Sequence, residues 1–169
     1  MTTTYIALLR AVNVGGTDKL PIAKLKAMCS ELGFVNVRTY IASGNVVFGS
    51  KASAAKVKSM LEATLKTYAG KAVDVLIRTQ PEMTAVLANN PFPAAAPNRT
   101  VAIFLDTAPP VNTLETVAGR RNEQIAMGLR EIYVHYGDGM ATSKLRIPAA
   151  TVGTARNMNT VAKLTALAR

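Results

Sequence analysis

Hydrophobic and polar positions change their spacing several times along the first eighty residues, and each change predicts a new element. The stretch Tyr5–Val12 is apolar at almost every position, which is typical of a strand buried on both faces. From Pro21 the apolar residues recur three or four positions apart until Gly33. That spacing predicts an amphipathic helix with a proline in its first turn and a glycine at its end. We therefore expect the chain to begin with a strand, a glycine-containing loop and a helix.

Two further strands, a second helix and a fourth strand are predicted in the same half. Phe34–Ile41 and Val46–Phe48 are rich in β-branched and aromatic residues, and the Ser43–Asn45 sequence between them is typical of a tight turn. The segment Ser53–Tyr68 has helical spacing, and Ala72–Arg78 alternates like a strand. The resulting order, strand–helix–strand–strand–helix–strand, is that of a ferredoxin-like unit.

A proline-rich segment separates this unit from a second one. Pro81–Leu87 predicts a short helix, and Asn90–Pro97 contains three prolines, which lack an amide donor and restrict the residues before them. We expect a ferredoxin-like subdomain at 1–80, a helix and proline-rich connection at 81–99, and a second ferredoxin-like subdomain at 100–169. The predicted fold class is therefore α+β, with two α/β sandwich subdomains of the βαββαβ type.

The second predicted subdomain repeats much of this pattern. Its elements are a strand, a helix, a two-stranded hairpin, a short helical piece and a final helix. They are placed at Thr100–Leu105, at Val111–Val117, at Gln124–Met127 with Glu131–Tyr136, near Ser143–Arg146, and from about Asn159. No segment before the final helix has the pattern of a last strand, so we predict that the second subdomain is incomplete or modified.

The charge of the chain changes the kinds of ligand that we expect. Its 169 residues include 20 Lys and Arg against 10 Asp and Glu, which gives a net charge of +10 at pH 7. Such an excess attracts phosphate groups and strengthens non-specific contacts with nucleic acid. Basic residues also serve solubility alone, so nucleic-acid binding through a basic face stays an alternative that we do not favour.

The N-terminal segment and the cysteine content bear on location and on metal binding. The segment MTTTYIALLR has no basic region before its apolar run, and that run is too short for a signal peptide or a membrane span. We therefore expect a cytoplasmic protein that is not attached to a membrane, and we leave its oligomeric state open. Cys29 is the only cysteine and lies on the apolar stripe of the first helix, which predicts a packed thiol rather than a nucleophile or a metal ligand.

One edge of the first predicted sheet collects the best candidate binding residues. In a ferredoxin-like sheet the first two strands are parallel, so the end of the first strand lies beside the hairpin that follows the second. The loop after the second helix, which contains Gly70 and Lys71, belongs to the same edge. The candidates are Arg10, Asn13, Gly15, Gly16 and Lys19 at the strand end, and Ser43, Gly44 and Asn45 in the hairpin.

Residues of these types can together hold an anion. Glycine-rich loops present backbone N–H groups, and amide and basic side chains add further donors, so the edge predicts a site for a small anionic or phosphate-bearing ligand. The alternative explanation is conformational, because turns use glycine and asparagine to reach positive φ.

A second polar cluster precedes the final predicted helix. Residues 153–160 read GTARNMNT, in which Asn157 or Asn159 can cap the helix and Arg156 adds a cation. Lys144 lies shortly before this cluster. Capping alone explains the amides, whereas Arg156 together with Lys144 favours an anion site at the helix start. We therefore add Lys144, Arg156 and Asn157 to the candidate anion-binding residues.

Recognisable catalytic and nucleotide-binding motifs are absent from the sequence. The pair Gly15-Gly16 completes neither a Walker loop nor a dinucleotide fingerprint. His135 is the only histidine, and Ser43 lacks the glycines two positions before and after it that a nucleophile elbow has. Neither residue therefore predicts a triad or a metal site. We expect no metal and no cofactor, and we lean towards a protein that is not an enzyme, with an enzyme of unknown reaction as an alternative.

Five ordered segments resemble the signatures of one bacterial family. YIALLRAVNVGG at residues 5–16 is similar to the opening L-L-R-G-I-N-V-G-G, and TYIASGNVVF at 39–48 is similar to a second signature. NPF at 90–92, SKL at 143–145 and TARNMNTV at 154–161 resemble later ones. The family is that called domain of unknown function 1697, and the resemblance spans essentially the whole chain.

This resemblance implies a pair of ferredoxin-like subdomains, and it brings no established activity, cofactor or catalytic residue. The chain departs from the family pattern at two positions. Ala11 stands where the family commonly has glycine, and Met158 stands where tryptophan is frequent. The methionine weakens any idea that an aromatic side chain stacks on a ligand at that position.

Overall fold

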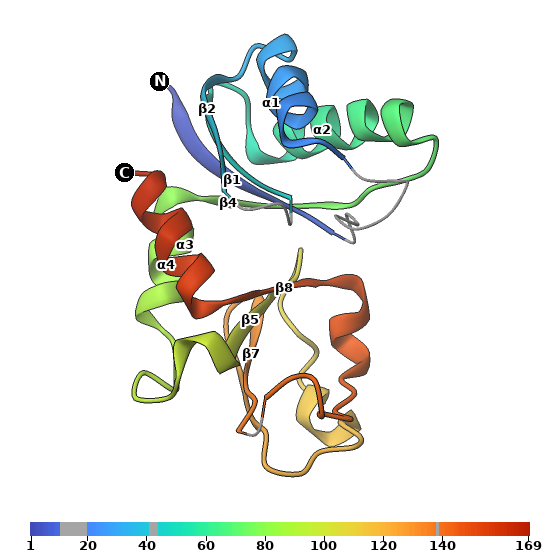
Figure 1. Ribbon diagram of the computed structural model, residues 1–169, viewed down its shortest axis with the longest axis vertical. Coiled ribbons are helices and arrows are strands. Elements are labelled where there is room, and N and C mark those ends of the chain that lie inside the picture. Colours follow the sequence, from blue (N-terminus) through green and yellow to red (C-terminus); the bar gives the residue numbers. More distant parts are fainter. Residues whose placement is uncertain (11–19, 41–43, 138) are drawn as a thin grey trace. The chain divides into compact units, whose positions relative to one another are not determined.

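The computed structural model describes residues 1–10, 20–40, 44–137 and 139–169. It divides into two units, Met1–Met83 with Leu164–Arg169 and Thr84–Lys163, which we call the first and the second unit. Each unit contains one four-stranded sheet, and all neighbouring strands are antiparallel (Figure 1). The α+β class predicted from the sequence is confirmed, while the boundaries predicted at residues 80 and 100 stay predictions.

The first sheet has the strand order of a ferredoxin-like fold. Its strands are β1 (Thr3–Leu9), β2 (Val35–Tyr40), β3 (Asn45–Ser50) and β4 (Val75–Thr79). They lie in the order β2-β3-β1-β4. The helices are α1 (Ile22–Glu31), α2 (Ala54–Ala69) and α3 (Gln80–Ala88), and α1 and α2 lie over the same face of the sheet (Figure 1).

The helix boundaries of the first unit follow the predicted signals. Pro21 precedes the first residue of α1, and Gly33 lies just beyond its end with φ +87°. The Ser53 Oγ accepts a hydrogen bond from the Lys56 N–H at the start of α2, at 3.2 Å. Gly70 ends that helix in the left-handed conformation, with φ +72°.

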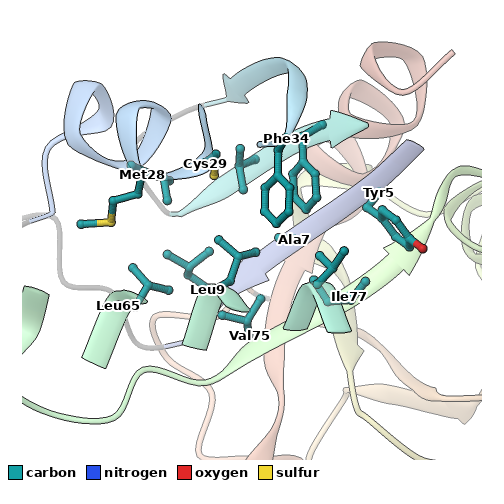
Figure 2. Packing of buried hydrophobic residues seen from close by; sticks show 14 residues of the cluster. Tyr5, Ala7, Leu9, Met28, Cys29, Phe34, Leu65, Val75 and Ile77 are labelled. Carbon is teal, nitrogen blue, oxygen red and sulfur yellow. The ribbon is translucent and has the colours of Figure 1, made fainter. Parts of the chain in front are cut away.

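The core of the first unit lies between α1, α2 and the sheet. Alternate residues of β1, including Tyr5, Ala7 and Leu9, belong to it together with Leu65 of α2 (Figure 2). The rings of Phe34 and Phe48 stack with their centroids 4.2 Å apart.

Cys29 is fully buried in this core, and desolvation raises the pKa of its thiol to about 12. The prediction of a packed thiol is confirmed.

Residues on both faces of β1 are buried, as its continuous apolar run predicts. From Tyr5 to Leu9 no residue is more than 4% exposed. The strand ends at Leu9, and residues 11 and 12 of the longer predicted strand lie outside the described residues. Arg78 of β4 is only 1% exposed and projects from the face opposite the α1 and α2 core, because it pairs in register with Ile6 rather than with a core residue of β1.

The second unit repeats this strand order. Its strands are β5 (Thr100–Phe104), β6 (Gln124–Met127), β7 (Glu131–His135) and β8 (Thr154–Asn157), in the order β6-β7-β5-β8. The predicted lack of a last strand is wrong, because β8 pairs with β5. Its residues are mostly polar, so the sequence resembles a helix-capping segment. As an edge strand it buries Thr154 and Arg156 and leaves Ala155 exposed.

The helices between the strands of the second unit are short 3-10 turns. Instead of the predicted helix at Val111–Val117 the structure has η2 (Thr113–Thr116), because threonine hydroxyls bond backbone carbonyls three residues back. The piece predicted near Ser143–Arg146 is not helical, since Arg146 forms a bridge with Ala118. The remaining elements are η1 (Pro97–Arg99), η3 (Pro148–Val152) and α4 (Met158–Leu167), whose residues from Leu164 on belong to the first unit.

No helix in the described parts of the chain is long and apolar enough to cross a membrane.

Candidate functional site

Backbone hydrogen bonds join three segments at one edge of the first sheet. The Leu9 N–H donates to the Gly44 carbonyl at 2.9 Å, which places the β2–β3 hairpin beside the end of β1. The Arg10 N–H donates to the Asp74 carbonyl at 2.8 Å, which adds the segment before β4. Gly44 has φ +80°, a conformation that glycine adopts without strain. The order of the strands thus brings together residues far apart in the sequence.

The side chains of Arg10 and Asp74 form an ion pair at the surface of this edge. The Arg10 Nη1 lies 3.1 Å from the Asp74 Oδ2, and the two side chains are 34% and 56% exposed. A pair this open to solvent contributes about 0–1 kcal/mol to stability. A stronger anion can therefore displace the carboxylate from the guanidinium at little cost in stability.

A surface hollow of about 420 Å³ has Asp74 in its wall. Its lining combines small apolar side chains with charged ones. The lining residues are Ala55, Lys58, Ser59, Glu62, Ala63 and Lys66 of α2, and Ala72, Val73 and Asp74. The volume lies within the range of small-molecule sites.

Two of the charged residues in the hollow hold β4 against α2. Lys58 Nζ lies 2.9 Å from Glu62 Oε2, and that oxygen also accepts the Val75 N–H at 3.0 Å. Lys58 donates in addition to the Val75 carbonyl. By contrast Lys66 is exposed, and within the described residues its side chain has no hydrogen-bond or ion-pair partner. Lys66 is therefore the lysine of this hollow that is available to a ligand.

The remaining candidates of this edge differ in what the structure says of them. Asn45 is fully buried, and its Nδ2 donates to the Tyr40 carbonyl at 3.1 Å, so its side chain fastens the hairpin from inside. Five candidates lie outside the described residues: Asn13, Gly15, Gly16, Lys19 and Ser43.

The second candidate cluster is spread over two places in the second unit. Asn157 Oδ1 accepts the Thr160 N–H at 2.9 Å and so caps α4. Lys144 is followed by Leu145, which packs on the apolar face of the sheet that Val101 and Ile103 share. Arg156 pairs in register with Ala102 and projects from the opposite face. Lys144 and Arg156 are therefore not neighbours.

The guanidinium of Arg156 is almost enclosed. The residue is 8% exposed, and its Nη1 donates to the Thr154 Oγ1 at 2.7 Å and to the Ala155 carbonyl at 2.9 Å. Desolvation lowers the pKa of Arg156 to about 10, so it still carries a charge at neutral pH. This burial makes Arg156 a poor first contact for a ligand that arrives from solvent.

Sequence reasoning did not single out Asp74 or the lining of the hollow. The available signal was topological, since the loop after the second helix is expected at the same edge as the end of the first strand. No group of three or more His, Cys, Asp or Glu side chains within the described parts of the chain could hold a metal ion.

The fold and this edge define a protein of two ferredoxin-like units with a candidate anion site. The model of a family described as protein of unknown function, DUF1697, matches residues 1–133, and the chain belongs to that family.

The structure is similar to that of the conserved bacterial protein SP0830 from Streptococcus pneumoniae, with a TM-score of 0.82 and 24% sequence identity over 100% of each chain. At this identity the likeness shows the fold alone. No curated protein matches the sequence.

Proposed function

We propose that the protein binds a small anionic ligand that carries a phosphate group, at the edge formed by the end of β1, the β2–β3 hairpin and the segment before β4. The observation that carries the proposal is the position of Arg10. The Arg10 N–H donates to the Asp74 carbonyl, and the N–H of the neighbouring Leu9 donates to the Gly44 carbonyl. The Arg10 side chain nevertheless stays about one-third exposed at the surface. A cation on a fixed backbone with an open side chain suits anion capture.

The ion pair with Asp74 fits this role. A guanidinium binds carboxylate and phosphate in the same forked geometry, so a phosphate can take the place of the Asp74 carboxylate. Asp74 then keeps Arg10 oriented while no ligand is bound, and it competes with the ligand for the same donors. Asp74 therefore lowers the affinity for the ligand.

The adjacent hollow suits a ligand larger than phosphate itself. Lys66 adds a second cation to its rim, and the alanines of α2 offer an apolar surface beside the charges. This combination favours a compact molecule with one apolar part and one phosphate group.

The residues outside the described structure enter the proposal on sequence grounds alone. Asn13, Gly15, Gly16 and Lys19 follow β1 directly, and Ser43 precedes Gly44. Backbone N–H groups of a glycine pair, an amide, a hydroxyl and a lysine are all donors to a phosphate.

Amide NMR during titration with inorganic pyrophosphate and with adenosine monophosphate tests this proposal. We expect saturating shifts at Arg10, Gly44 and Asp74. The variant Arg10→Gln should weaken binding about tenfold or more, because a charge-assisted contact is lost. Asp74→Asn should tighten binding, because the competing charge is removed and the backbone carbonyl remains.

The control is Lys56→Gln, which removes an exposed positive charge of α2 outside the hollow. Equal weakening in Arg10→Gln and Lys56→Gln would point to non-specific attraction by net charge and would contradict the proposal. Weaker binding in Asp74→Asn would contradict the role given to the ion pair. A polynucleotide that binds with a steep salt dependence, while both small probes do not bind, would favour nucleic acid instead.

A further inference from the structure

A second, smaller hollow lies in the second unit and shares no residue with the hollow described above. It has a volume of about 90 Å³ and is formed by residues 121–123, by 136, 137 and 139, and by 142–144. Its walls are made largely of polar groups. The volume corresponds to roughly three water molecules at about 30 Å³ each. A space of this size suits a tetrahedral oxyanion.

The carboxylate of Glu123 fixes two walls of this hollow. Glu123 is 5% exposed, its Oε1 accepts the Arg121 N–H at 2.6 Å, and its Oε2 accepts the Ser143 hydroxyl at 2.5 Å. The Ser143 Oγ accepts the Leu145 N–H in turn, at 3.2 Å. These bonds hold the segments that carry Arg121 and Lys144 in one arrangement before any ligand arrives, which reduces the cost of binding.

Positive charge exceeds negative charge around this space. Arg121 and Lys144 are both exposed, whereas Glu123 is buried with a donor on each carboxylate oxygen. Within the described residues neither Arg121 nor Lys144 has a side-chain partner. Two cations at the rim against one engaged carboxylate favour an anion over a cation.

Neutral donors complete the lining. Thr142 and Tyr136 also line the hollow, and the pKa of the Tyr136 phenol is raised by desolvation and then by the charge of Glu123. That phenol stays protonated and remains a hydrogen-bond donor at neutral pH. The hydrogen bond from Ser143 is the main cause that lowers the pKa of Glu123. The carboxylate therefore stays charged at neutral pH and keeps its hydrogen bonds with Arg121 and Ser143.

We propose that this hollow is a second anion site, which binds a tetrahedral oxyanion of the size of phosphate between Arg121 and Lys144. Arg121 supplies a forked pair of donors, Lys144 a point charge, and Thr142 and Tyr136 neutral hydrogen bonds. The ligand is either a free oxyanion or the terminal phosphate of a larger molecule whose remainder stays in solvent. The site does not depend on the function proposed for the first unit.

Titration with inorganic phosphate and with sulfate, at constant ionic strength kept with chloride, tests this site by amide NMR. We expect saturating shifts at Gly137, Gly139 and Ser143. Arg121→Gln and Lys144→Gln should each weaken binding about tenfold or more, because each removes one charge-assisted contact. Lys144→Arg, which keeps the charge, should retain most of the binding.

Two matched variants separate this site from the rest of the surface. Lys163→Gln removes an exposed charge of α4 in the same unit, and Lys66→Gln removes the available lysine of the larger hollow. Both should leave the shifts at Gly137 and Gly139 unchanged. Equal weakening by all four Gln variants, or shifts that do not saturate, would overturn the proposal. If inorganic phosphate does not bind but a nucleotide binds here through its terminal phosphate, the ligand is the larger molecule.

Discussion

The two units have the same sheet and different helical covers. In each, four antiparallel strands lie in the ferredoxin-like order, and the first strand of each pairs with the third and the fourth. In the first unit the crossovers are helices of 10 and 16 residues, α1 and α2. In the second they contain 3-10 helices of 4 and 5 residues, η2 and η3. The strand order therefore does not require an α-helix in each crossover.

The junction after the last strand is built alike in both units. Arg78 lies opposite Ile6 on β1, and Arg156 lies opposite Ala102 on β5. In each unit a helix begins two residues after the arginine, and the residue between them caps that helix. Glu82 N donates to Thr79 Oγ1 at 3.3 Å in the first unit, and Thr160 N donates to Asn157 Oδ1 at 2.9 Å in the second. Different residues thus cap the helix at the same strand-to-helix junction.

The covers are stabilised by different kinds of contact. Apolar faces of α1 and α2 pack on the first sheet, with Val57, Leu61 and Leu65 all buried. The loops of the second unit depend more on polar bonds, such as Ser143 to Glu123 and the paired backbones of Ala118 and Arg146. We infer that apolar truncation harms the first cover most, and loss of polar or backbone geometry the second.

The largest expected effect is in the first cover. Leu61→Ala should lower the free energy of unfolding by about 2–5 kcal/mol, because Leu61 is completely buried and leaves a cavity. Leu145→Ala in the second cover should cost roughly 1 kcal/mol, since Leu145 is only partly buried. Urea unfolding, followed by hydrogen exchange in each unit, measures both. Equal costs would show that the second cover is as tightly packed as the first.

Two glycines with similar backbone angles give a smaller and more local contrast. Gly70 and Gly119 have φ +72° and +71°, and a methyl group at Gly70 meets nothing within 4 Å. Gly70→Ala should therefore cost roughly 1–2 kcal/mol for the left-handed conformation alone. At Gly119 the methyl would lie 2.0 Å from the Lys144 carbonyl oxygen, which adds about 1–3 kcal/mol of overpacking.

The consequence for binding separates the two glycine variants further. Gly119→Ala has to displace the backbone of Lys144, so phosphate binding in the smaller hollow should fall, whereas Gly70→Ala should leave it unchanged. Thermal unfolding and the phosphate titration check these outcomes. If Gly119→Ala binds phosphate as tightly as the unsubstituted protein, the position of the Lys144 backbone does not determine phosphate binding in the smaller hollow.

The same contrast explains how much the sequence could predict. Apolar spacing and glycine or proline signals located α1, α2 and the seven strands β1 to β7, because most of those elements bury a regular stripe or face. The strand β8 was missed because an edge strand needs few apolar residues, and Arg156 is buried in a way that no local pattern indicates. The prediction of an α-helix at η2 was wrong because hydrogen bonds from threonine side chains to the nearby backbone compete with helix formation.

For the candidate site, topology predicted what spacing could not. The position of Arg10 beside Gly44 follows from the strand order alone, as does the arrival of the segment before β4. The pairing of Arg10 with Asp74 and the bond from Ser143 to Glu123 depend on side-chain packing across 64 and 20 residues, so they became visible only in the structure.

The smallest expected effect is a pH dependence confined to the second unit. Hydrogen bonds from Ser143 and Arg121 lower the pKa of Glu123 below its ordinary value of 4.5. Because the folded pKa is the lower one, this carboxylate stabilises the protein above pH 4.5, and that contribution is lost as the pH falls through the folded pKa. Acid should therefore loosen residues 121–123 and 142–145 before it affects α1 and α2.

The variant Glu123→Gln isolates this contribution, because the amide cannot accept the Ser143 hydroxyl on its nitrogen side. At neutral pH it should be less stable than the unsubstituted protein, and the difference should narrow as the pH falls below 4.5. Glu115→Gln, at an exposed position of the same unit, should show no such convergence. Hydrogen exchange at several pH values measures both variants. A gap between Glu123→Gln and the unsubstituted protein that stays constant into acid would mean that packing, and not the buried carboxylate, holds the loops of the second unit.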